Sequence, residues 1–350
     1  MQKNDKMLQN SEREPWLDLA KAIGIVLVLW AHALPKDDYM WIWINSFHMP
    51  LFFCISGYQY VCRGKFCSYI VKKVRTLWIP FEVSSVVTYT VFLLIGQVTL
   101  SVKEIAKIVL MVAPGPLLGA TWFIPVLLFT SVIYDLLYRL TRKLDFEQEY
   151  KTDIVLTIVA LACLIVGIKM SLPYRGSVIL RSVFFFQLGQ LIRKYLNNKK
   201  YDLILGIILM STVSIIAIFN TTSYLNNTYT SVPLFVLAAI GGSIGVSMLC
   251  RWAESQINIE KLKIVLYIGM NTKGPLIWQF VAFKIVTAVQ ILIYGLSWSK
   301  ILDFPVIYEY AHGIWILLDV IIGLFFSTWI YKIVNRPVEK YIDKLLARRT

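Results

Sequence analysis

The sequence predicts an all-α integral membrane protein, a bundle of about ten transmembrane helices. Of its 350 residues, 57% are hydrophobic and only 16% are charged, and the mean hydropathy is +0.64. A soluble domain carries about a quarter charged residues. The chain also contains repeated apolar runs of about 20 residues, the length that crosses the hydrocarbon core of a bilayer. The loops between these runs are too short to hold a soluble domain, so we expect one membrane domain over residues 1–350.

The apolar runs place ten expected spans along the chain. Charged residues interrupt the third, sixth and ninth of them, at Glu82, Arg181 and Lys284. Charged groups are costly in hydrocarbon, so these side chains should face the interior of the bundle. The expected spans lie near residues 17–35, 41–61, 77–97, 121–139, 153–171, 178–194, 203–219, 232–250, 275–296 and 311–333.

The Lys and Arg residues lie mainly in the loops on one side of these spans. Because cytoplasmic loops are enriched in Lys and Arg, both termini should be cytoplasmic. The hydrophilic segment 1–15 and the basic tail 334–350 would then lie in the cytosol, and we expect no cleaved signal peptide before the first span. Of the 35 Lys and Arg residues, the loops on the other side hold only Lys36, Lys103, Lys107, Arg175 and Lys300.

Charge and cysteine content argue against a nucleic-acid-binding protein and against a protein stabilised by metal ions or disulfides. The net charge of +14 follows from the membrane topology, so no nucleic-acid partner is expected. The five cysteines have no regular metal-binding spacing. Cys62 and Cys67 flank a basic stretch on the predicted cytosolic side, where thiols stay reduced, so we expect no disulfide.

Span one carries polar residues along one face. Asp18, Lys21 and His32 are spaced by three and eleven residues. On an α-helix an eleven-residue step returns to within roughly 20° of its starting direction and advances about 16 Å. Asp18 and Lys21 form either an interfacial ion pair, with the lysine extending to the headgroups, or one wall of a polar path through the bundle.

The three histidines, His32, His48 and His312, map to the end of the bundle opposite the cytosol. No Asp or Glu accompanies them at helical ligand spacing, so we predict no metal site. A neutral imidazole can accept a hydroxyl proton near pH 7, which favours a role in proton transfer. His312 is expected to be a residue at headgroup level.

Other charged groups lie within the spans. Lys284 and Asp319 fall near mid-membrane in consecutive antiparallel spans, and we expect them to neutralise each other. Arg181 lies near the outer end of its span, where it either binds an anionic group of a substrate or lipid or extends to the surface.

A basic cluster on the cytosolic side consists of Lys72, Lys73 and Arg75. Such a cluster either sets the topology and contacts anionic lipids or binds the phosphates of a nucleotide-like donor.

Several strings form a set of motifs that covers the whole chain. WLDLAKAIGIVLVLWAH in span one is followed by SFHMPLFFCISGY in span two, and the latter is specific. Further along are KKVRTLWIP, TWFIPVLLF, FFFQLGQLI, YIGMNTKGPLIW and NRPVEK. This set resembles the acyltransferase 3 family of integral membrane acyltransferases, whose members have ten spans. Lys21 and the HMPLFF string are most similar to the branch that includes fucose 4-O-acetylase-like proteins.

The resemblance implies transfer of an acyl group, commonly acetyl from acetyl-CoA, to a hydroxyl of a cell-envelope glycan or lipid-linked sugar. It implies acyl-CoA as donor substrate and no permanently bound cofactor. The expected partners are acyl-CoA, an envelope polysaccharide or lipid-linked sugar as acceptor, and membrane lipids. The expected location is the cell (inner) membrane.

The resemblance also assigns functional residues. The family's basic residue and the histidine eleven positions later fall on Lys21 and His32, and its second basic motif falls on Lys72 and Arg75. Many relatives carry a histidine where this chain has Gln279, so the role of that histidine does not transfer.

These assignments lead to a hypothesis for the reaction. His32 acts as general base on the acceptor hydroxyl or carries the acyl group transiently. Asp18 orients Lys21, and His48 lines the acceptor end. Lys21 with Lys72, Lys73 and Arg75 would hold the CoA end, and Trp122, Arg181 and Asn271 are further candidates for substrate binding.

Two alternative functions stay open. A transporter or flippase for an envelope precursor would also use ten spans and buried charges, although no inverted repeat is visible. The second alternative is a non-catalytic partner in polysaccharide assembly.

Overall fold

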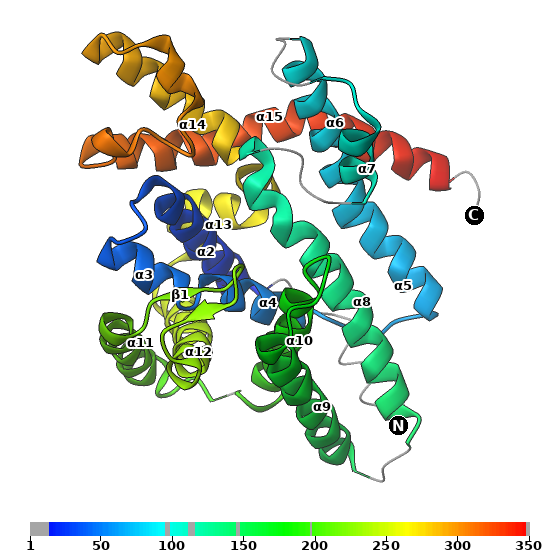
Figure 1. Cartoon of the computed structure of the whole chain (residues 1–350). Coiled ribbons are helices and arrows are strands. Elements are labelled where there is room, and N and C mark those ends of the chain that lie inside the picture. Colours follow the sequence, from blue (N-terminus) through cyan, green and yellow to red (C-terminus); the bar gives the residue numbers. More distant parts are fainter. Residues whose placement is uncertain (1–13, 95–98, 111–115, 145–147, 197, 348–350) are drawn as a thin grey trace.

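The computed structural model describes residues 14–94, 99–110, 116–144, 148–196 and 198–347, which form a helical bundle (Figure 1). Its α-helices are α2 (Pro15–Ala33), α3 (Tyr39–Asn45), α4 (His48–Tyr58), α5 (Phe66–Lys73), α6 (Ile79–Leu94), α7 (Val102–Val109), α8 (Phe123–Arg142), α9 (Glu149–Lys169), α10 (Gly176–Tyr195), α11 (Asp202–Phe219), α12 (Val232–Gln256), α13 (Lys263–Met270), α14 (Lys273–Tyr294) and α15 (Ile314–Ala347). Strands β1 (Thr222–Ser223) and β2 (Thr228–Tyr229) pair antiparallel between α11 and α12.

Several shorter helical segments connect these elements. The segment η1 (Val74–Trp78) is a π-helical turn that makes α5, η1 and α6 one continuous helix. The 3₁₀ segments are η2 (Pro116–Trp122), η3 (Ile259–Leu262), η4 (Trp298–Leu302) and η5 (Tyr308–Tyr310).

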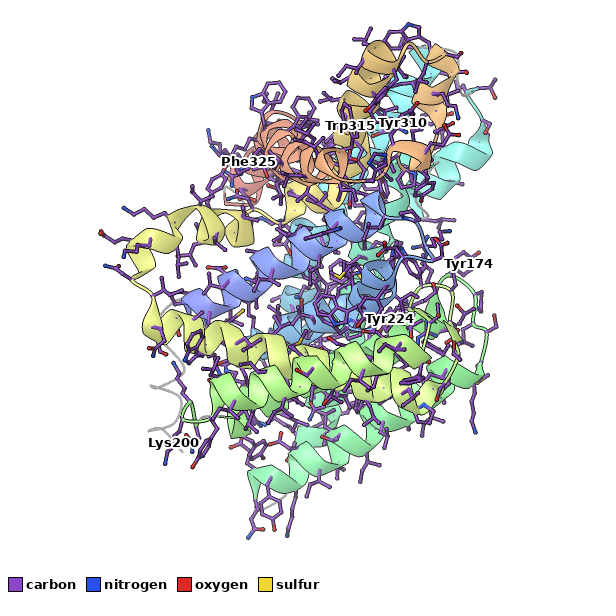
Figure 2. The ribbon with its side chains drawn as sticks, turned by 90° about the vertical axis from the view of Figure 1, so that its left-hand side faces the viewer. Tyr174, Lys200, Tyr224, Tyr310, Trp315 and Phe325 are labelled. Carbon is purple, nitrogen blue, oxygen red and sulfur yellow. The ribbon has the colours of Figure 1, made fainter. Side chains whose placement is uncertain are left out.

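Within the described ranges, seven helices are long and apolar enough to cross a bilayer. Apolar side chains on their outer surface, such as Ile207, Leu292 and Phe325, are exposed, as expected for contact with lipid. Figure 2 shows Phe325 on the outside of the bundle and Tyr224 inside it. The chain is therefore a multi-pass helical membrane protein. The seven are α2, α9, α11, α12, α14, α15 and the helix over Gly119–Arg142 that contains α8.

The expected span over 41–61 is not one continuous helix. It is divided into α3 and α4, which meet at Ser46 and Phe47. Pro50 explains the break, because proline has no N–H to donate to the carbonyl four residues earlier and its ring clashes with that carbonyl. At 11 residues, α4 is about 16 Å long, well short of the roughly 30 Å hydrocarbon core.

The two ends of the bundle differ in charge. We call the end with loops 59–65, 198–201 and 257–262 and the end of α15 the basic end. The end with loops 34–38, 220–231 and 295–313 is the opposite end. At the basic end Arg251 and Asp202 form a buried ion pair of 2.6 Å between α12 and α11. Lys194 of α10 pairs with Asp153 of α9 at 2.7 Å. Ion pairs therefore join neighbouring helices where the basic residues gather.

Small residues bring the central helices into close contact. A Cβ added at Gly57 of α4 would overlap the backbone carbonyl of Phe186 in α10, and one at Gly189 would overlap the carbonyl of Cys54. Gly269 packs α13 in the same way against the carbonyl of Asp18 in α2. Small residues at helix interfaces allow this close approach in membrane proteins. The packing places α2 at the centre, in contact with α4, α12, α13 and α15.

Candidate active site

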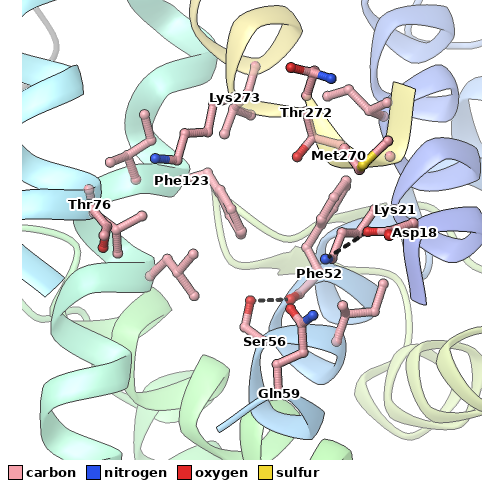
Figure 3. A pocket seen from close by; sticks show the side chains of 18 of the residues that line it. Asp18, Lys21, Phe52, Ser56, Gln59, Thr76, Phe123, Met270, Thr272 and Lys273 are labelled. Atoms are coloured by element: carbon pink, nitrogen blue, oxygen red, sulfur yellow. Dashed lines mark hydrogen bonds and ion pairs between the residues drawn. The ribbon is translucent and has the colours of Figure 1, made fainter. Parts of the chain in front are cut away.

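A cavity of about 820 Å³ runs from the basic end into the bundle. It lies between α2, α4, η1, α8, the connection from α13 to α14, and α15. Figure 3 shows Lys21, Phe52, Phe123 and Lys273 around it. A cavity of this size is typical of a small-molecule or cofactor site.

One face of α2 forms a wall of this cavity. Asp18, Lys21, Ile25 and Val28 all line it, at the spacing of successive helical turns. Lys21 Nζ lies 3.3 Å from Asp18 Oδ1, and the Asp18 carboxylate is buried. Of the predicted polar face, Asp18 and Lys21 therefore point into this cavity.

The lining of the cavity at the basic end is rich in cations. Lys21, Arg193, Lys273 and Arg336 come from four different helices. Arg193 Nη1 donates to the carbonyl of Tyr60 at 3.1 Å. The cations lie near the N-terminus of α14, where the helix dipole adds further positive potential. Acidic residues lie among them, so the cations are partly compensated.

The break between α13 and α14 positions two of these cations. Lys273 begins α14 directly after the break at Asn271, and its Nζ lies 3.5 Å from Glu339 of α15. Arg336 Nη2 donates to Asn271 Oδ1 at 3.1 Å, and Asn271 also lines the cavity. The two cations are thus held by residues from both sides of the cavity.

The inner half of the cavity is apolar. Ile25, Val28, Met49, Phe52 and Phe123 line it. The rings of Phe52 and Phe123 lie 5.7 Å apart. Phe52 also packs against α2, since a Cβ added at position 24 of that helix would lie 2.9 Å from its ring. Aromatic rings therefore narrow the cavity on its way toward the opposite end.

His32 lies one helical turn beyond Val28, the innermost cavity residue of α2, and does not itself line the cavity. Its Nδ1 donates to the Val28 carbonyl at 2.8 Å, because a carbonyl can only accept. In the neutral ring Nε2 is therefore the proton acceptor. The ring packs edge-to-face on Phe280 of α14, with centroids 4.9 Å apart, so His32 faces the interior of the bundle.

His48 is held in the same way at the start of α4. It is buried, and its Nδ1 donates to the Ile44 carbonyl at 2.8 Å, which caps the last turn of α3. It directly precedes the cavity residue Met49 and lies close enough to His32 for their charges to interact. His312 is exposed at the opposite end. The structure thus brings two of the three histidines together beyond the inner end of the cavity.

The basic cluster Lys72, Lys73 and Arg75 lies outside the lining of the cavity. Lys73 Nζ lies over the Tyr69 ring, 5.4 Å from its centroid, and burial together with the charge of Lys72 lowers the pKa of Lys73 to about 8. Arg75 forms an ion pair with Asp343 near the end of α15. The π-helical turn instead directs the next residues, Thr76 and Leu77, to the cavity.

Trp122 and Arg181 also lie away from the cavity lining. Trp122 packs on Phe123. Arg181 is fully buried and donates to the carbonyls of Gly167 at 2.7 Å and Tyr224 at 2.6 Å. It therefore joins the end of α9 to the loop of the β-hairpin, which is a structural position. Of the three further candidates for substrate binding, Asn271 is the one at the cavity.

Among the described residues, Lys284 and Asp319 form no direct ion pair, although they lie close enough for their charges to interact as expected. Lys284 Nζ donates instead to the backbone carbonyls of Asp303 and Pro305. The irregular chain at 303–305 has carbonyls that no helix satisfies, and these compete for the ammonium group. Asp319 is buried, with its Oδ1 lacking a hydrogen-bond partner among the described residues.

Lys273, Arg336 and Arg193 are site residues that sequence reasoning did not select. Lys273 lies in the YIGMNTKGPLIW string and Arg336 in NRPVEK, so motifs already marked two of the three positions. Which of the many Lys and Arg residues point into the bundle depends on packing. In the described part of the chain, no group of three or more His, Cys, Asp and Glu residues gathers to hold a metal ion.

Residues 14–334 match an acyltransferase domain, the one that defines the acyltransferase 3 family. The chain belongs to this family. Its match includes the cavity residues of α2 together with His32 and His48, so this multi-pass helical protein is a membrane acyltransferase. No curated protein and no solved structure matches the chain.

Proposed function

We propose that this acyltransferase transfers an acetyl group from cytosolic acetyl-CoA to a hydroxyl group of a cell-envelope glycan or lipid-linked sugar. The observation that carries the proposal is a single cavity that is cationic at the basic end and apolar toward His32. The enzyme works in the cell (inner) membrane, with ten spans and both termini in the cytosol. Its motifs support a place in the fucose 4-O-acetylase-like branch.

The donor fits the two halves of the cavity. Coenzyme A carries a diphosphate and a further phosphate at one end, and Lys21, Lys273, Arg193 and Arg336 supply charge-assisted donors for such groups. The pantetheine arm is largely apolar and linear. Lys21 and His32 are about 16 Å apart along α2, a distance that an extended pantetheine arm spans. The acyl group would then lie near Val28, one turn from His32.

The imidazole of His32 is oriented for general base catalysis. Nδ1 is engaged with the Val28 carbonyl, so Nε2 accepts the proton of the acceptor hydroxyl. The hydroxyl oxygen attacks the thioester carbonyl carbon, and the carbon–sulfur bond breaks. The proton then passes from His32 to the sulfur, so that CoA leaves as the free thiol. His48, beside the inner end of the cavity, lines the acceptor side.

The test is turnover of labelled acetyl-CoA by the purified protein in lipid nanodiscs, with and without envelope glycan. We expect release of free CoA and transfer of label to the glycan. His32→Ala should abolish both, whereas His312→Ala, which changes an exposed histidine at the same end of the bundle, should leave them intact.

Two outcomes would overturn the proposal. Normal transfer by His32→Ala would exclude this residue from the chemistry. Movement of an envelope precursor across vesicles containing the protein, without acetyl-CoA turnover, would instead favour the transporter or flippase.

A further inference from the structure

Gln279 of α14 carries a buried amide oxygen that the fold does not satisfy. The residue is fully buried, and its Nε2 donates to the backbone carbonyl of Leu276 at 3.3 Å. The Leu276 carbonyl can only accept a hydrogen bond, so the amide nitrogen faces it and the amide oxygen faces away. The remaining atom, Oε1, has no hydrogen-bond partner in the described part of the chain. A buried acceptor without a partner is destabilising, so its retention needs a reason other than folding.

The neighbour of this amide is His32. The Gln279 side chain lies within interaction range of the His32 ring, and the next residue, Phe280, packs edge-to-face against the same ring. On α2 the ring is held by the Val28 carbonyl. Two adjacent residues of α14 and one backbone group of α2 thus lie beside the imidazole. Phe280 contributes no acceptor, which leaves the Gln279 oxygen as the polar atom that α14 offers.

We propose that Gln279 is a positioning residue for His32, whose amide oxygen stabilises the imidazolium formed during acyl transfer. This inference rests on the proposed function, in which His32 takes the proton of the acceptor hydroxyl. The neutral imidazole already has its single N–H engaged with Val28, so the amide oxygen is without a hydrogen bond before the reaction. Protonation creates a second N–H and a positive charge, and both are stabilised by a nearby carbonyl dipole.

The chemistry requires an acceptor that is present before the charge develops. A preorganised dipole aimed at the developing charge stabilises the transition state more than the ground state, and this difference raises the rate. The described residues show one other titratable group whose charge acts on the His32 ring, namely His48. A neutral amide stabilises the imidazolium without introducing a charge that would hold His32 permanently protonated.

Gln279→Met tests the proposal, because methionine has a similar shape but no acceptor oxygen. We expect kcat to fall about 10- to 100-fold, the factor that a hydrogen bond to a charged group contributes. The KM for acetyl-CoA should stay unchanged. Thermal unfolding should occur no earlier than in the wild type, because the substitution removes a polar group that lacks a partner. Gln279→Glu places an ionisable carboxyl group beside His32, and its negative charge would hold the imidazole protonated, so this variant should also lower kcat.

The matched control is Gln290→Met, the same substitution at a buried glutamine eleven residues further along α14, which should not alter kcat. If Gln279→Met is not recovered as folded protein, Gln279→Asn replaces it, since asparagine keeps the amide but withdraws its oxygen from His32.

The results separate this inference from the proposed function. Full kcat in Gln279→Met, with His32→Ala inactive, would overturn the role of Gln279 and leave the proposed function standing. A loss of kcat that is matched by a lower unfolding temperature would show a structural role. A higher KM for the acceptor with unchanged kcat would assign the oxygen to substrate binding. An active His32→Ala would overturn the proposed function itself.

Discussion

Removing the two cations Lys273 and Arg336 should weaken the binding of acetyl-CoA without altering the reaction. Both line the cavity at the basic end, and both are held by residues on the facing elements, Glu339 and Asn271. The double substitution Lys273→Gln with Arg336→Gln removes two positive charges but keeps side chains of similar length and polarity. The change should affect the nucleotide end of the donor alone.

The expected rise in the KM for acetyl-CoA follows from the exposure of the two side chains. The Lys273 side chain is 44% exposed and Arg336 is also exposed, so each ion pair with a phosphate is screened by water. Exposed pairs contribute up to ~1 kcal/mol each. The two together should therefore raise the KM for acetyl-CoA about tenfold, with little change in kcat. Because salt screens exposed charges, the effect should be larger at low than at physiological ionic strength.

The assay compares two donors with the purified protein in nanodiscs, by following release of the free thiol. Acetyl-pantetheine lacks the phosphates of CoA, so its KM should not change in the double variant. The control is Lys332→Gln with Lys340→Gln, which removes the same charge from α15 at residues that do not line the cavity. An equal rise in KM for both donors would refute this reasoning.

The same assay tests whether the donor phosphates bind at the cations of the cavity or at the basic cluster, where the family's second basic motif falls. Lys72→Gln with Arg75→Gln changes residues outside the cavity lining, one of which is paired with Asp343. If this variant raises the KM for acetyl-CoA more than the change at Lys273 and Arg336, the donor phosphates bind at the basic cluster instead.

Two further predictions concern the shape and the stability of the bundle. Phe52→Ala removes a ring that narrows the apolar half of the cavity, so the rate with butyryl-CoA relative to acetyl-CoA should rise, and an unchanged ratio in competition assays would contradict this. Asp202→Ala leaves the buried charge of Arg251 without its carboxylate, which should cost ~3–5 kcal/mol of folding stability. Thermal unfolding in detergent measures the loss. Glu309→Ala, which breaks an exposed pair, should leave the unfolding temperature nearly unchanged.

The sequence by itself determined the class of protein and one wall of its cavity. Long apolar runs and few charges are properties of composition, and they are sufficient to predict membrane-spanning helices. The shared direction of Asp18 and Lys21 also followed from spacing alone, because residues three apart lie on the same side of any α-helix. His32, which the spacing placed on the same face, does not line the cavity. The motifs indicated the family, and the match of the acyltransferase domain over residues 14–334 confirms it. Even the break before α4 had a local cause in Pro50.

Only the tertiary structure decided which polar groups meet. Lys284 and Asp319 lie close enough for their charges to interact, as their depth predicted, yet Lys284 donates its hydrogen bonds to carbonyls of a loop about 20 residues away in the chain. Lys273 and Arg336 reach the same cavity from different helices, and Gln279 lies beside His32 although 247 positions separate them in the numbering. Helical periodicity relates residues within one helix, whereas the rotation and depth of neighbouring helices depend on close contacts between them, such as Gly57 against Phe186. Those contacts are set by the packing of the whole bundle, and they place the buried amide against the imidazole.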